Sequence, residues 1–528
     1  MDGPSVIGVV GAGTMGAGIA QLSCLSGART LLHDPEAQAL DRGVERIKDQ
    51  LHRGAERGRW DAGAATDAAE RLHAVPRLED LSTCELVIEA APERLELKRE
   101  LFSRLSNEVV SEDCVLATNT SSLLITAIAS AAKRPERVVG MHFFNPAPVM
   151  VLVEVVAWAE SSEPALSVAR AAGEAMGKRV IAAADGPGFL VNRCNRPFGL
   201  EALKLLAEQV APIEVIDRVC RLGGGFRMGP FELMDLVGVD VGLEISRSFY
   251  EQSFGEPRWQ PSPIAVRTVA AGRLGRKSRR GYYHYPESGE HRDQDPDPRP
   301  PGGGDGLVVI AGDCPLALAL GRAAEQAGWE VSSPAQAGPR PAPFLILDLT
   351  AGEEPDAPLQ GAPQAICCSG GSLALLDPGG AAVGFHALPP FAESRLVELS
   401  RGLDSAESAA TRAEHFFTTL GKQIAWVGDA PGLVLGRIVC QLANEAAFAL
   451  GEGLGSAQDI DSGMTLGLNY PRGILAWADE IGLDQVLLVL DALAQERGEE
   501  RYRAAPMLRR LVWSGRLGRE TGDGFFSY

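Results

Sequence analysis

The chain has 528 residues, a formal net charge of −19 and a pI near 5.0. This length exceeds what a single hydrophobic core usually serves, so we expect several domains. The acidic balance argues against nucleic acid or an anionic membrane as the partner, because affinity for phosphates is built from clustered Lys and Arg. No apolar run reaches the roughly eighteen residues that a membrane-spanning helix needs.

Cysteine usage and the first residues indicate the compartment. Nine cysteines without CxxC spacing suit a reducing environment better than a disulfide framework or a zinc site. The opening MDGPSVIGVVGAG lacks the charged region and cleavage signature of a signal peptide. We therefore expect a cytoplasmic protein without a metal centre, in which the adjacent Cys367 and Cys368 are small buried hydrophobes.

Residues 1–186 have the pattern of an α/β domain. The apolar runs VIGVV, ELVIEA, CVLAT and RVVGM alternate with helical patterns, which predicts a parallel sheet with crossover helices. Residues 36–75 are helix-like, with little β-branching and many Arg, Glu and Ala. Over 187–285 the strands give out and apolar residues recur at three-to-four spacing, so we expect a helical domain there.

Residues 286–306, PESGEHRDQDPDPRPPGGGDG, cluster Pro, Gly and acidic residues and predict a linker. After it the order of elements repeats. LVVIAG and PFLILDL are typical of strands, EHFFTTLG is typical of a helix, and a helical tail follows. We expect a second α/β domain over 307–428 and a second helical domain over 429–528.

The two halves also align residue by residue. GMHFFNPAPVMVLVEV (140–155) and GFHALPPFAESRLVEL (384–399) share an offset of 244, which maps His142 to His386 and Glu154 to Glu398. GRLGRKSRRGYYHY (272–285) returns as GRLGRETGDGFFSY (515–528). We interpret the chain as a tandem duplication of a two-domain unit.

A glycine-rich turn in the first copy predicts a dinucleotide site. VIGVVGAGTMGAGIAQ places Gly11, Gly13 and Gly16 directly after an apolar strand and at the start of a helix. The glycines allow a tight turn and close approach of the backbone to a pyrophosphate, while the helix N-terminus favours negative charge. Asp34, at the end of RTLLHD, is placed to bind ribose hydroxyls and to repel a 2′-phosphate, which selects NAD over NADP.

His142 and Glu154 are the candidate proton-transfer pair. His142 lies in VVGMHFFNPAP just after an apolar strand, where side chains at the carboxyl edge of such a sheet face the cofactor crevice. Imidazole can take a hydroxyl proton near neutral pH, and a carboxylate on its second nitrogen would fix the tautomer. The alternative is a satisfied core histidine, which the pairing with Glu154 and the dinucleotide motif disfavours.

Five ordered motifs in the first copy resemble the (S)-3-hydroxyacyl-CoA dehydrogenase family. They are MHFFNP followed by EVV, the upstream NTSSL (119–123), DGPGFLVNR (185–193) and GPFEL (229–233). The resemblance covers about residues 4–285. It implies a Rossmann-type NAD-binding domain followed by a helical C-terminal domain, an acyl-CoA substrate, and a helical hairpin over 36–75 that lies over the CoA portion.

By this resemblance His142 is the general base, Glu154 its orienting partner, and Ser121 and Asn192 the residues that hold the substrate's oxygen atoms. The alternative for Ser121 is to cap a helix starting near Leu123.

The resemblance also assigns four positions to the cofactor side: Glu93, Lys98, Asn145 and Lys277. Glu93 and Lys98 are five residues apart, one too many for a helical pair, so we expect no local salt bridge between them.

The second copy has lost most of this set. Under the best local alignment Gly13 becomes Cys314, Gly16 becomes Ala317 and Asp34 becomes Ala335, so the phosphate cradle is absent. Asn192 maps to Gly436. We predict a degenerate second copy in which His386 and Glu398 persist as a hydrogen-bonded pair without catalysis.

What the second copy keeps is its helical tail. We predict an internal pseudo-dimer, in which residues 429–528 pack on 187–285 in place of half a dimer, with a homodimer of the whole chain as a further option. This arrangement resembles the long-form dehydrogenases of aromatic-acid (phenylacetate) catabolism that act on 3-hydroxyadipyl-CoA and 3-hydroxybutyryl-CoA. The alternatives are a dehydrogenase of a free hydroxy acid such as L-gulonate, and a non-catalytic, crystallin-like or acyl-CoA-binding protein.

Overall fold

The computed structural model describes residues 3–287, 291–335, 342–352 and 362–528. The chain divides into two compact units. The first contains residues up to Arg193 together with Glu452–Leu468, and the second contains Cys194–Gly451 together with Asn469–Tyr528. One stretch from the second half of the sequence is therefore part of the first unit.

The first unit is built on an eight-stranded sheet in the order β3-β2-β1-β4-β5-β6-β7-β8. All neighbouring strands pair in parallel except β6 and β7, which are antiparallel. The predicted sheet is confirmed, and the antiparallel pair is an addition that alternating apolar runs do not reveal. The strands are β1 (Val6–Val10), β2 (Arg29–His33), β3 (Leu72–Ala74), β4 (Leu86–Glu89), β5 (Val115–Thr118), β6 (Val138–Phe143), β7 (Leu152–Ala157) and β8 (Arg179–Ala184).

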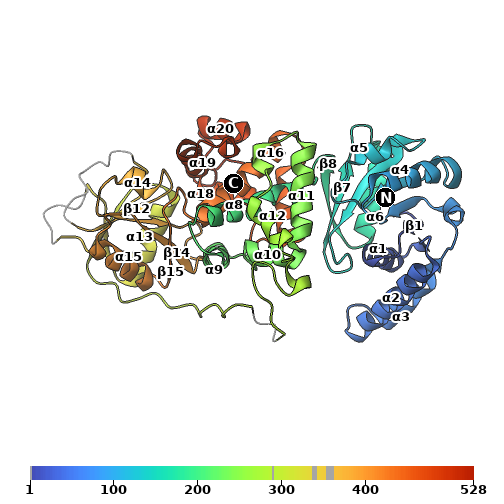
Figure 1. Cartoon of the computed structure of the whole chain (residues 1–528), viewed down its shortest axis with the longest axis horizontal. Helices are drawn as coiled ribbons and strands as arrows, with labels where there is room; N and C mark the ends of the chain where they lie inside the picture. Colours follow the sequence, from blue (N-terminus) through green and yellow to red (C-terminus); the bar gives the residue numbers. More distant parts are fainter. Residues whose placement is uncertain (1–2, 288–290, 336–341, 353–361) are drawn as a thin grey trace. The chain divides into compact units, whose positions relative to one another are not determined.

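Helices cover this sheet and bury apolar side chains against it. Two of them, α2 and α3, pack on each other and form a hairpin that extends from the sheet (Figure 1), so the predicted helical pair over 36–75 is confirmed. The helical segments of the first unit are α1 (Thr14–Leu25), α2 (Ala37–Glu56), α3 (Ala62–Arg71), η1 (Leu78–Thr83), α4 (Leu95–Arg104), η2 (Leu105–Val109), α5 (Ile125–Ala129), η3 (Pro135–Arg137), α6 (Glu163–Ala175), α7 (Val191–Cys194) and α17 (Ala457–Leu468).

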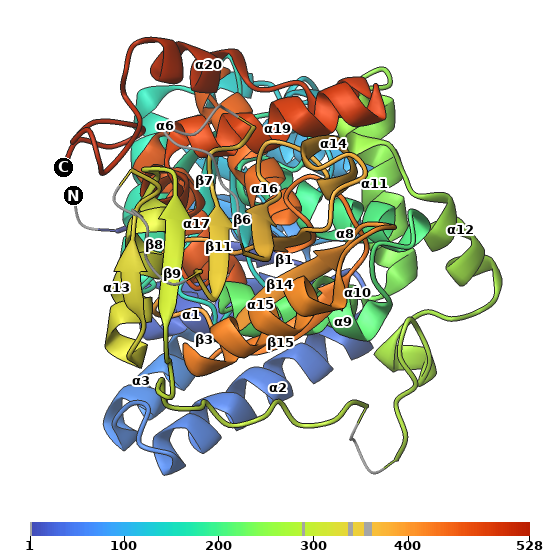
Figure 2. The same cartoon turned by 90° about the vertical axis from the view of Figure 1, so that its left-hand side faces the viewer.

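The second unit contains a seven-stranded sheet in the order β10-β9-β11-β12-β13-β14-β15, again with one antiparallel pair, β13 with β14. Helix α15 packs across one face of this sheet (Figure 2). The strands are β9 (Leu307–Ala311), β10 (Glu330–Ser332), β11 (Leu345–Asp348), β12 (Gln364–Cys367), β13 (Val383–His386), β14 (Leu396–Arg401) and β15 (Gln423–Val427), and the helices are α13 (Pro315–Ala327), α14 (Leu373–Leu376) and α15 (Glu407–Thr419).

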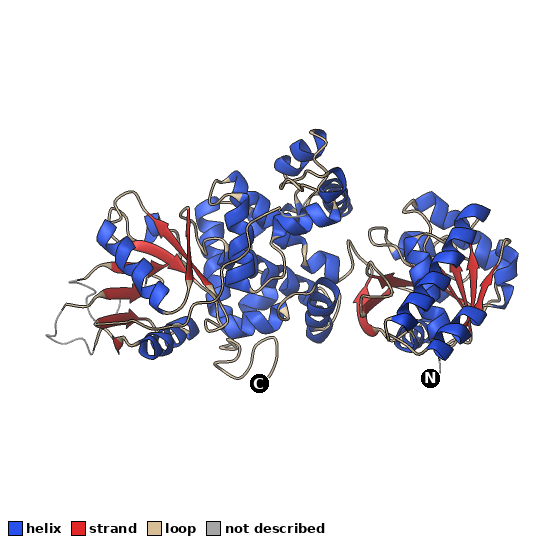
Figure 3. Ribbon diagram, turned by 90° about the horizontal axis from the view of Figure 1, so that it is seen from below, coloured by secondary structure: helices blue, strands red, loops and turns tan. Residues whose placement is uncertain are grey.

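Outside this sheet, the regular elements that the structure describes in the second unit are helices, drawn in blue in Figure 3. The segments before the second sheet are α8 (Arg196–Ala207), α9 (Ile213–Arg218), η4 (Val219–Gly223), α10 (Pro230–Val237), α11 (Val239–Gln252), η5 (Pro257–Trp259), α12 (Pro263–Ala270) and η6 (Arg276–Ser278). Those after it are α16 (Leu435–Gly451), α18 (Ile474–Ile481), α19 (Leu483–Arg497), η7 (Glu500–Tyr502) and α20 (Pro506–Trp513).

Helices α8 and α16 pack on each other in this unit. The fully buried Arg437 on α16 binds two carboxylates of the earlier helical segment, Glu201 at 2.9 Å and Glu208 at 2.7 Å. A buried arginine needs such partners, because an uncompensated charge in the interior is costly. The two helical stretches predicted from the sequence therefore contact each other, and buried ion pairs form part of this contact.

In residues 286–306, the described positions form neither helix nor strand. The segment is nevertheless fastened to the helices, since Asp295 binds Arg221 at 2.9 Å and His291 binds Glu232 at 2.8 Å. Among the helices that the structure describes, none combines the length and apolarity needed to cross a membrane.

Candidate active site

The glycine-rich turn between β1 and α1 leaves no space for side chains at two of its three glycines. Gly11 has a φ of +101°, and a Cβ there would lie 2.6 Å from the Ala90 carbonyl oxygen. A Cβ at Gly16 would lie 1.7 Å from the Gly11 oxygen. A Cβ at Gly13 would meet nothing within 4 Å, so the backbone at the start of α1 is open to a ligand there.

Asp34 follows β2 and closes the other side of this turn. Its carboxylate accepts hydrogen bonds from the Ala12 N–H at 2.8 Å and the Glu36 N–H at 2.9 Å. A cavity is lined by Gly11, Gly13, Asp34 and the α4 side chains Leu97 and Leu101. Its volume is about 740 Å³, within the range of cofactor sites. The open glycine backbone, the helix N-terminus and the carboxylate fit the pyrophosphate and the ribose of NAD.

His142 and Glu154 face each other across the antiparallel pair of β6 and β7. The imidazole Nδ1 lies 2.6 Å from Glu154 Oε2, and both side chains are buried. The other carboxylate oxygen accepts hydrogen bonds from the Leu190 and Val191 N–H groups at 3.2 Å and 3.0 Å. These donors fix the orientation of the Glu154 carboxylate, and the hydrogen bond that it accepts from Nδ1 leaves Nε2 as the acceptor nitrogen of the imidazole.

Ser121 completes the group around the imidazole. Its hydroxyl lies 3.1 Å from His142 Nε2. The alternative role, capping a helix near Leu123, is wrong, because the helix begins at Ile125 and its first N–H groups, those of Ile125 and Thr126, bind the Asp185 carboxylate.

Glu93 holds the loop that carries Ser121. Its Oε1 accepts hydrogen bonds from the Ser121 N–H at 3.0 Å and the Ser122 N–H at 3.1 Å. Burial opposes ionisation, but Lys98 and the loop's hydrogen bonds together keep the pKa of Glu93 below its usual value. Lys98 Nζ lies 3.4 Å from Glu93 Oε2, so the expectation of no local ion pair is wrong. The helical spacing rule does not apply, since Glu93 precedes α4, which begins at Leu95.

Glu89 is a member of this network that the sequence analysis missed. It is fully buried at the end of β4 and lies 2.6 Å from Lys98 Nζ, with a further hydrogen bond of 2.7 Å from the Thr118 hydroxyl. The sequence signal was an acidic residue that ends an apolar strand and precedes a Lys by nine positions. Glu89 fixes Lys98, and Lys98 with Glu93 fixes the Ser121 loop.

The remaining predicted residues lie apart from this cluster or beside it. Asn192 directly follows Val191, whose N–H binds Glu154. Asn145 is exposed just after β6. Lys277 belongs to the second unit, where its Nζ lies 2.6 Å from Asp240 Oδ2.

The second histidine and glutamate, His386 and Glu398, are also paired across antiparallel strands, but the predicted hydrogen bond between them is wrong. Within the described chain, His386 Nδ1 is buried and has no hydrogen-bond partner. The Glu398 carboxylate accepts instead from the Val434 and Leu435 N–H groups. Burial lowers the pKa of His386 to about 4 and raises that of Glu398 to about 8, so both groups are largely uncharged near neutral pH.

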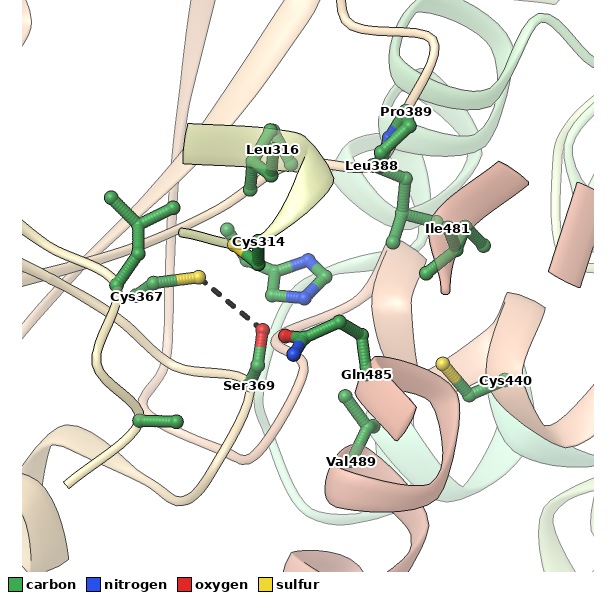
Figure 4. A pocket seen from close by; sticks show the side chains of 14 residues that line it. Cys314, Leu316, Cys367, Ser369, Leu388, Pro389, Cys440, Ile481, Gln485 and Val489 are labelled. Carbon is green, nitrogen blue, oxygen red and sulfur yellow. Dashed lines mark hydrogen bonds between the residues drawn. The ribbon is translucent and has the colours of Figure 1, made fainter. Parts of the chain in front are cut away.

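The imidazole of His386 packs directly on Gly436, where a Cβ would lie 2.2 Å from His386 Cε1. A cavity of only about 20 Å³ remains beside it, enough for about one water molecule, lined by Cys314, Cys367 and Ser369 among others (Figure 4). The second pair therefore lacks the space for a substrate. Cys367 and Cys368 are both buried, as predicted.

A dinucleotide cradle in the same unit as a buried His–Glu pair defines an NAD-dependent dehydrogenase. The family model described as "3-hydroxyacyl-CoA dehydrogenase, NAD binding domain" matches residues 6–186. The model described as "3-hydroxyacyl-CoA dehydrogenase, C-terminal domain" matches residues 188–285 and again 432–528. The chain belongs to the 3-hydroxyacyl-CoA dehydrogenase family.

Individual relatives agree with this assignment. A 3-hydroxyadipyl-CoA dehydrogenase of Escherichia coli K12 is 35% identical over 518 residues, which cover 96% of this chain and 98% of the relative. A crystal structure of a 3-hydroxybutyryl-CoA dehydrogenase, also from Escherichia coli K12, superposes with a TM-score of 0.81 at 35% identity and covers 97% of this chain and 99% of its own. A probable 3-hydroxybutyryl-CoA dehydrogenase of Deinococcus radiodurans is 40% identical over 285 residues, 53% of this chain and 99% of the relative. The family resemblance and the NAD cofactor predicted from the sequence are confirmed.

Proposed function

We propose that His142 is the general base of an NAD-dependent oxidation of (S)-3-hydroxyacyl-CoA to 3-oxoacyl-CoA, with Glu154 as its orienting partner. The observation that carries this proposal is the buried imidazole held between Glu154 Oε2, 2.6 Å from Nδ1, and Ser121 Oγ, 3.1 Å from Nε2. This geometry leaves the Nε2 lone pair to accept a proton.

The proton then moves from the substrate hydroxyl to His142 Nε2. Glu154 stabilises the resulting imidazolium, because its carboxylate accepts a hydrogen bond from Nδ1, the ring nitrogen opposite Nε2. NAD⁺, when bound in the cradle of Gly11, Gly13 and Asp34, would supply the acceptor for the hydride that leaves the carbon bearing this hydroxyl. Ser121 holds the substrate hydroxyl and Asn192 the thioester oxygen, and these two assignments come from the motif resemblance together with the position of Ser121 beside Nε2.

The substrate within this class is proposed to be 3-hydroxyadipyl-CoA or 3-hydroxybutyryl-CoA, the compounds in the names of the relatives that align over this chain. The test is the rate of NAD⁺ reduction by the purified protein with each of the two esters, with NADP⁺ and free 3-hydroxybutyrate as controls. Turnover of either ester with NAD⁺ supports the proposal, and the faster ester identifies the acyl group. Activity on free 3-hydroxybutyrate alone would contradict this proposal and favour the alternative, a dehydrogenase of a free hydroxy acid such as L-gulonate.

We further propose that the chain is a tandem duplication with a degenerate second copy, with domains at 1–186, 187–285, 307–428 and 429–528. Hydrogen bonds whose side-chain members lie 244 residues apart in the two halves support this. Asp185 binds the N–H groups of Ile125 and Thr126, and Asp429 binds those of Leu373 and Ala374. Lys178 and Lys422 each donate to two backbone carbonyls, and Asp235 and Asp479 each accept from two N–H groups of the closing aromatic segment.

The two helical stretches are proposed to form an internal pseudo-dimer, supported by the packing of α8 on α16 and by the buried Arg437 ion pairs. Deleting residues 307–528 should then give an aggregating or inactive protein. A truncated chain that is soluble, monomeric and fully active would contradict this part of the proposal. A cytoplasmic location is proposed as well, and the nine free cysteines support it.

A further inference from the structure

Helix α17 comes from the second half of the sequence but belongs to the first unit, where it packs against β7 and β8. Two polar contacts anchor the segment that leads into it. The Ala184 N–H at the end of β8 donates to the Leu454 carbonyl at 2.8 Å. The buried Arg193 guanidinium lies 2.7 Å from the Glu452 carboxylate.

The same contacts recur in the second unit with the two halves exchanged. At the offset of 244, the Gly428 N–H donates to the Val210 carbonyl at 2.6 Å. Arg437, the counterpart of Arg193, lies 2.7 Å from Glu208, the counterpart of Glu452. Each half therefore gives a helix to the sheet of the other, in the reciprocal manner of a two-fold interface.

Two glycines of α17 bring it close to the catalytic pair. A Cβ at Gly463 would lie 2.6 Å from Val191 Cγ2. A Cβ at Gly467 would lie 2.9 Å from Leu152 Cδ2, and 3.5 Å from both Phe144 Cζ and Val191 Cγ1. No larger side chain fits at either position without displacing Val191, Leu152 or Phe144.

These neighbours of α17 contact the proton-transfer pair directly. The Val191 N–H binds Glu154 at 3.0 Å, and Glu154 holds His142 at 2.6 Å. The Phe144 ring lies 4.7 Å from the imidazole, centroid to centroid. We infer that α17 is a positioning element of the catalytic site, through which the second half sets the orientation of His142. This inference rests on the proposed role of His142.

The equivalent position in the first half offers a control. Gly223, which corresponds to Gly467, packs on the second sheet. A Cβ at Gly223 would lie 3.2 Å from Leu435 Cδ2 and 3.7 Å from the Leu396 carbonyl. The pair in that sheet, His386 and Glu398, has no hydrogen bond within it and no room for a substrate. A larger side chain at Gly223 should therefore perturb an equivalent interface without displacing the catalytic residues.

The experiment compares Gly467→Val with Gly223→Val in the full-length enzyme. We expect Gly467→Val to lower kcat by on the order of 10- to 100-fold, since small misplacements of reacting groups have effects of this size. The KM for NAD⁺ should stay within about twofold, because the cofactor cradle lies elsewhere in the unit, and the acid limb of the pH–rate profile should shift. Gly223→Val should keep the wild-type kcat per folded molecule. Equal kcat values for the two variants would overturn the inference.

A second matched pair covers the case in which a valine variant fails to fold. Glu452→Gln weakens the partner of Arg193, next to Asn192, whereas Glu208→Gln weakens the equivalent partner of Arg437. We expect only Glu452→Gln to lower kcat and shift the pH profile. A shared loss of melting temperature with unchanged kcat in both would assign α17 a structural role only. A wild-type protein inactive on both CoA esters would instead contradict the proposed function, before any variant is compared.

Discussion

The two halves of this chain hold the same pair of residues in the same strand register, yet the pairs differ in chemistry. His142 shares a short hydrogen bond with a Glu154 that is anchored by two N–H groups. Glu398 has equivalent backbone donors, but the His386 Nδ1 is left without a partner in the described chain. A carboxylate anchored by backbone N–H groups is thus not sufficient for a working base, because the imidazole must also be hydrogen-bonded to that carboxylate.

The largest expected effect separates the two histidines. His142→Ala should lower kcat by about 10² to 10⁴, because it removes the general base, while leaving NADH affinity nearly unchanged. His386→Ala is the matched control and should leave kcat unaltered. Steady-state kinetics and NADH fluorescence titration measure both quantities. Similar losses in the two variants would mean that the second pair takes part in catalysis.

The next effect concerns the loop that holds Ser121. Glu93→Gln weakens the hydrogen bonds to the Ser121 and Ser122 N–H groups and leaves Lys98 with Glu89 as its remaining ionic partner. We expect kcat/KM for the acyl-CoA to fall by about 10-fold. The control is the same substitution at an exposed position, Glu407→Gln, which removes an ion pair with Arg401. An unaltered kcat/KM in Glu93→Gln would show that the loop holds its position without this carboxylate.

A smaller effect, on stability, is expected at the small cavity beside His386. Gly436→Asn adds a side chain whose Cβ would lie 2.2 Å from the His386 ring. We expect destabilisation by about 1–3 kcal/mol, the usual cost of overpacking, without any gain in activity. Thermal unfolding tests this, with Gly242→Ala as control, since a Cβ there meets nothing within 4 Å. If Gly436→Asn melts like the wild type, the imidazole is free to move aside.

The smallest effect is a pH dependence of stability from Glu398. Its folded-state pKa of about 8 lies above the ordinary value of 4.5, so the folded protein keeps a proton that the unfolded chain has lost between these values. Stability from this group is therefore full below the ordinary pKa of 4.5, and it declines as pH rises from there to the folded pKa of about 8. Glu398→Gln should reduce the fall in melting temperature between about pH 6.5 and about pH 8.5. Identical slopes in the two proteins would contradict the raised pKa.

Much of the first unit could be predicted from the sequence, because local signals determine it. The glycine turn follows from the spacing of Gly11, Gly13 and Gly16, and apolar runs predicted the strands. The pairing of His142 with Glu154 could be expected from the family motif, and the antiparallel strands make it geometrically direct.

The parts that were missed depend on contacts between residues far apart in sequence. Glu93 and Lys98 pair because the chain turns before α4, and no helical rule describes that turn. The absence of a His386–Glu398 hydrogen bond could not be foreseen either, since the imidazole packs on Gly436, a residue distant in sequence. The placement of α17 in the first unit has no local signal at all, since it depends on how the halves exchange helices.

The segment 286–306 joins the two halves that exchange helices, and this covalent connection should affect how activity depends on enzyme concentration. In two separate chains the exchanged helices would be supplied by a second molecule, and activity would fall as the enzyme is diluted. Here the connecting segment, tied down through Asp295 and Arg221, makes the partner part of the same molecule at a high and fixed effective concentration. Specific activity should accordingly be independent of protein concentration down to the lowest level that can be assayed.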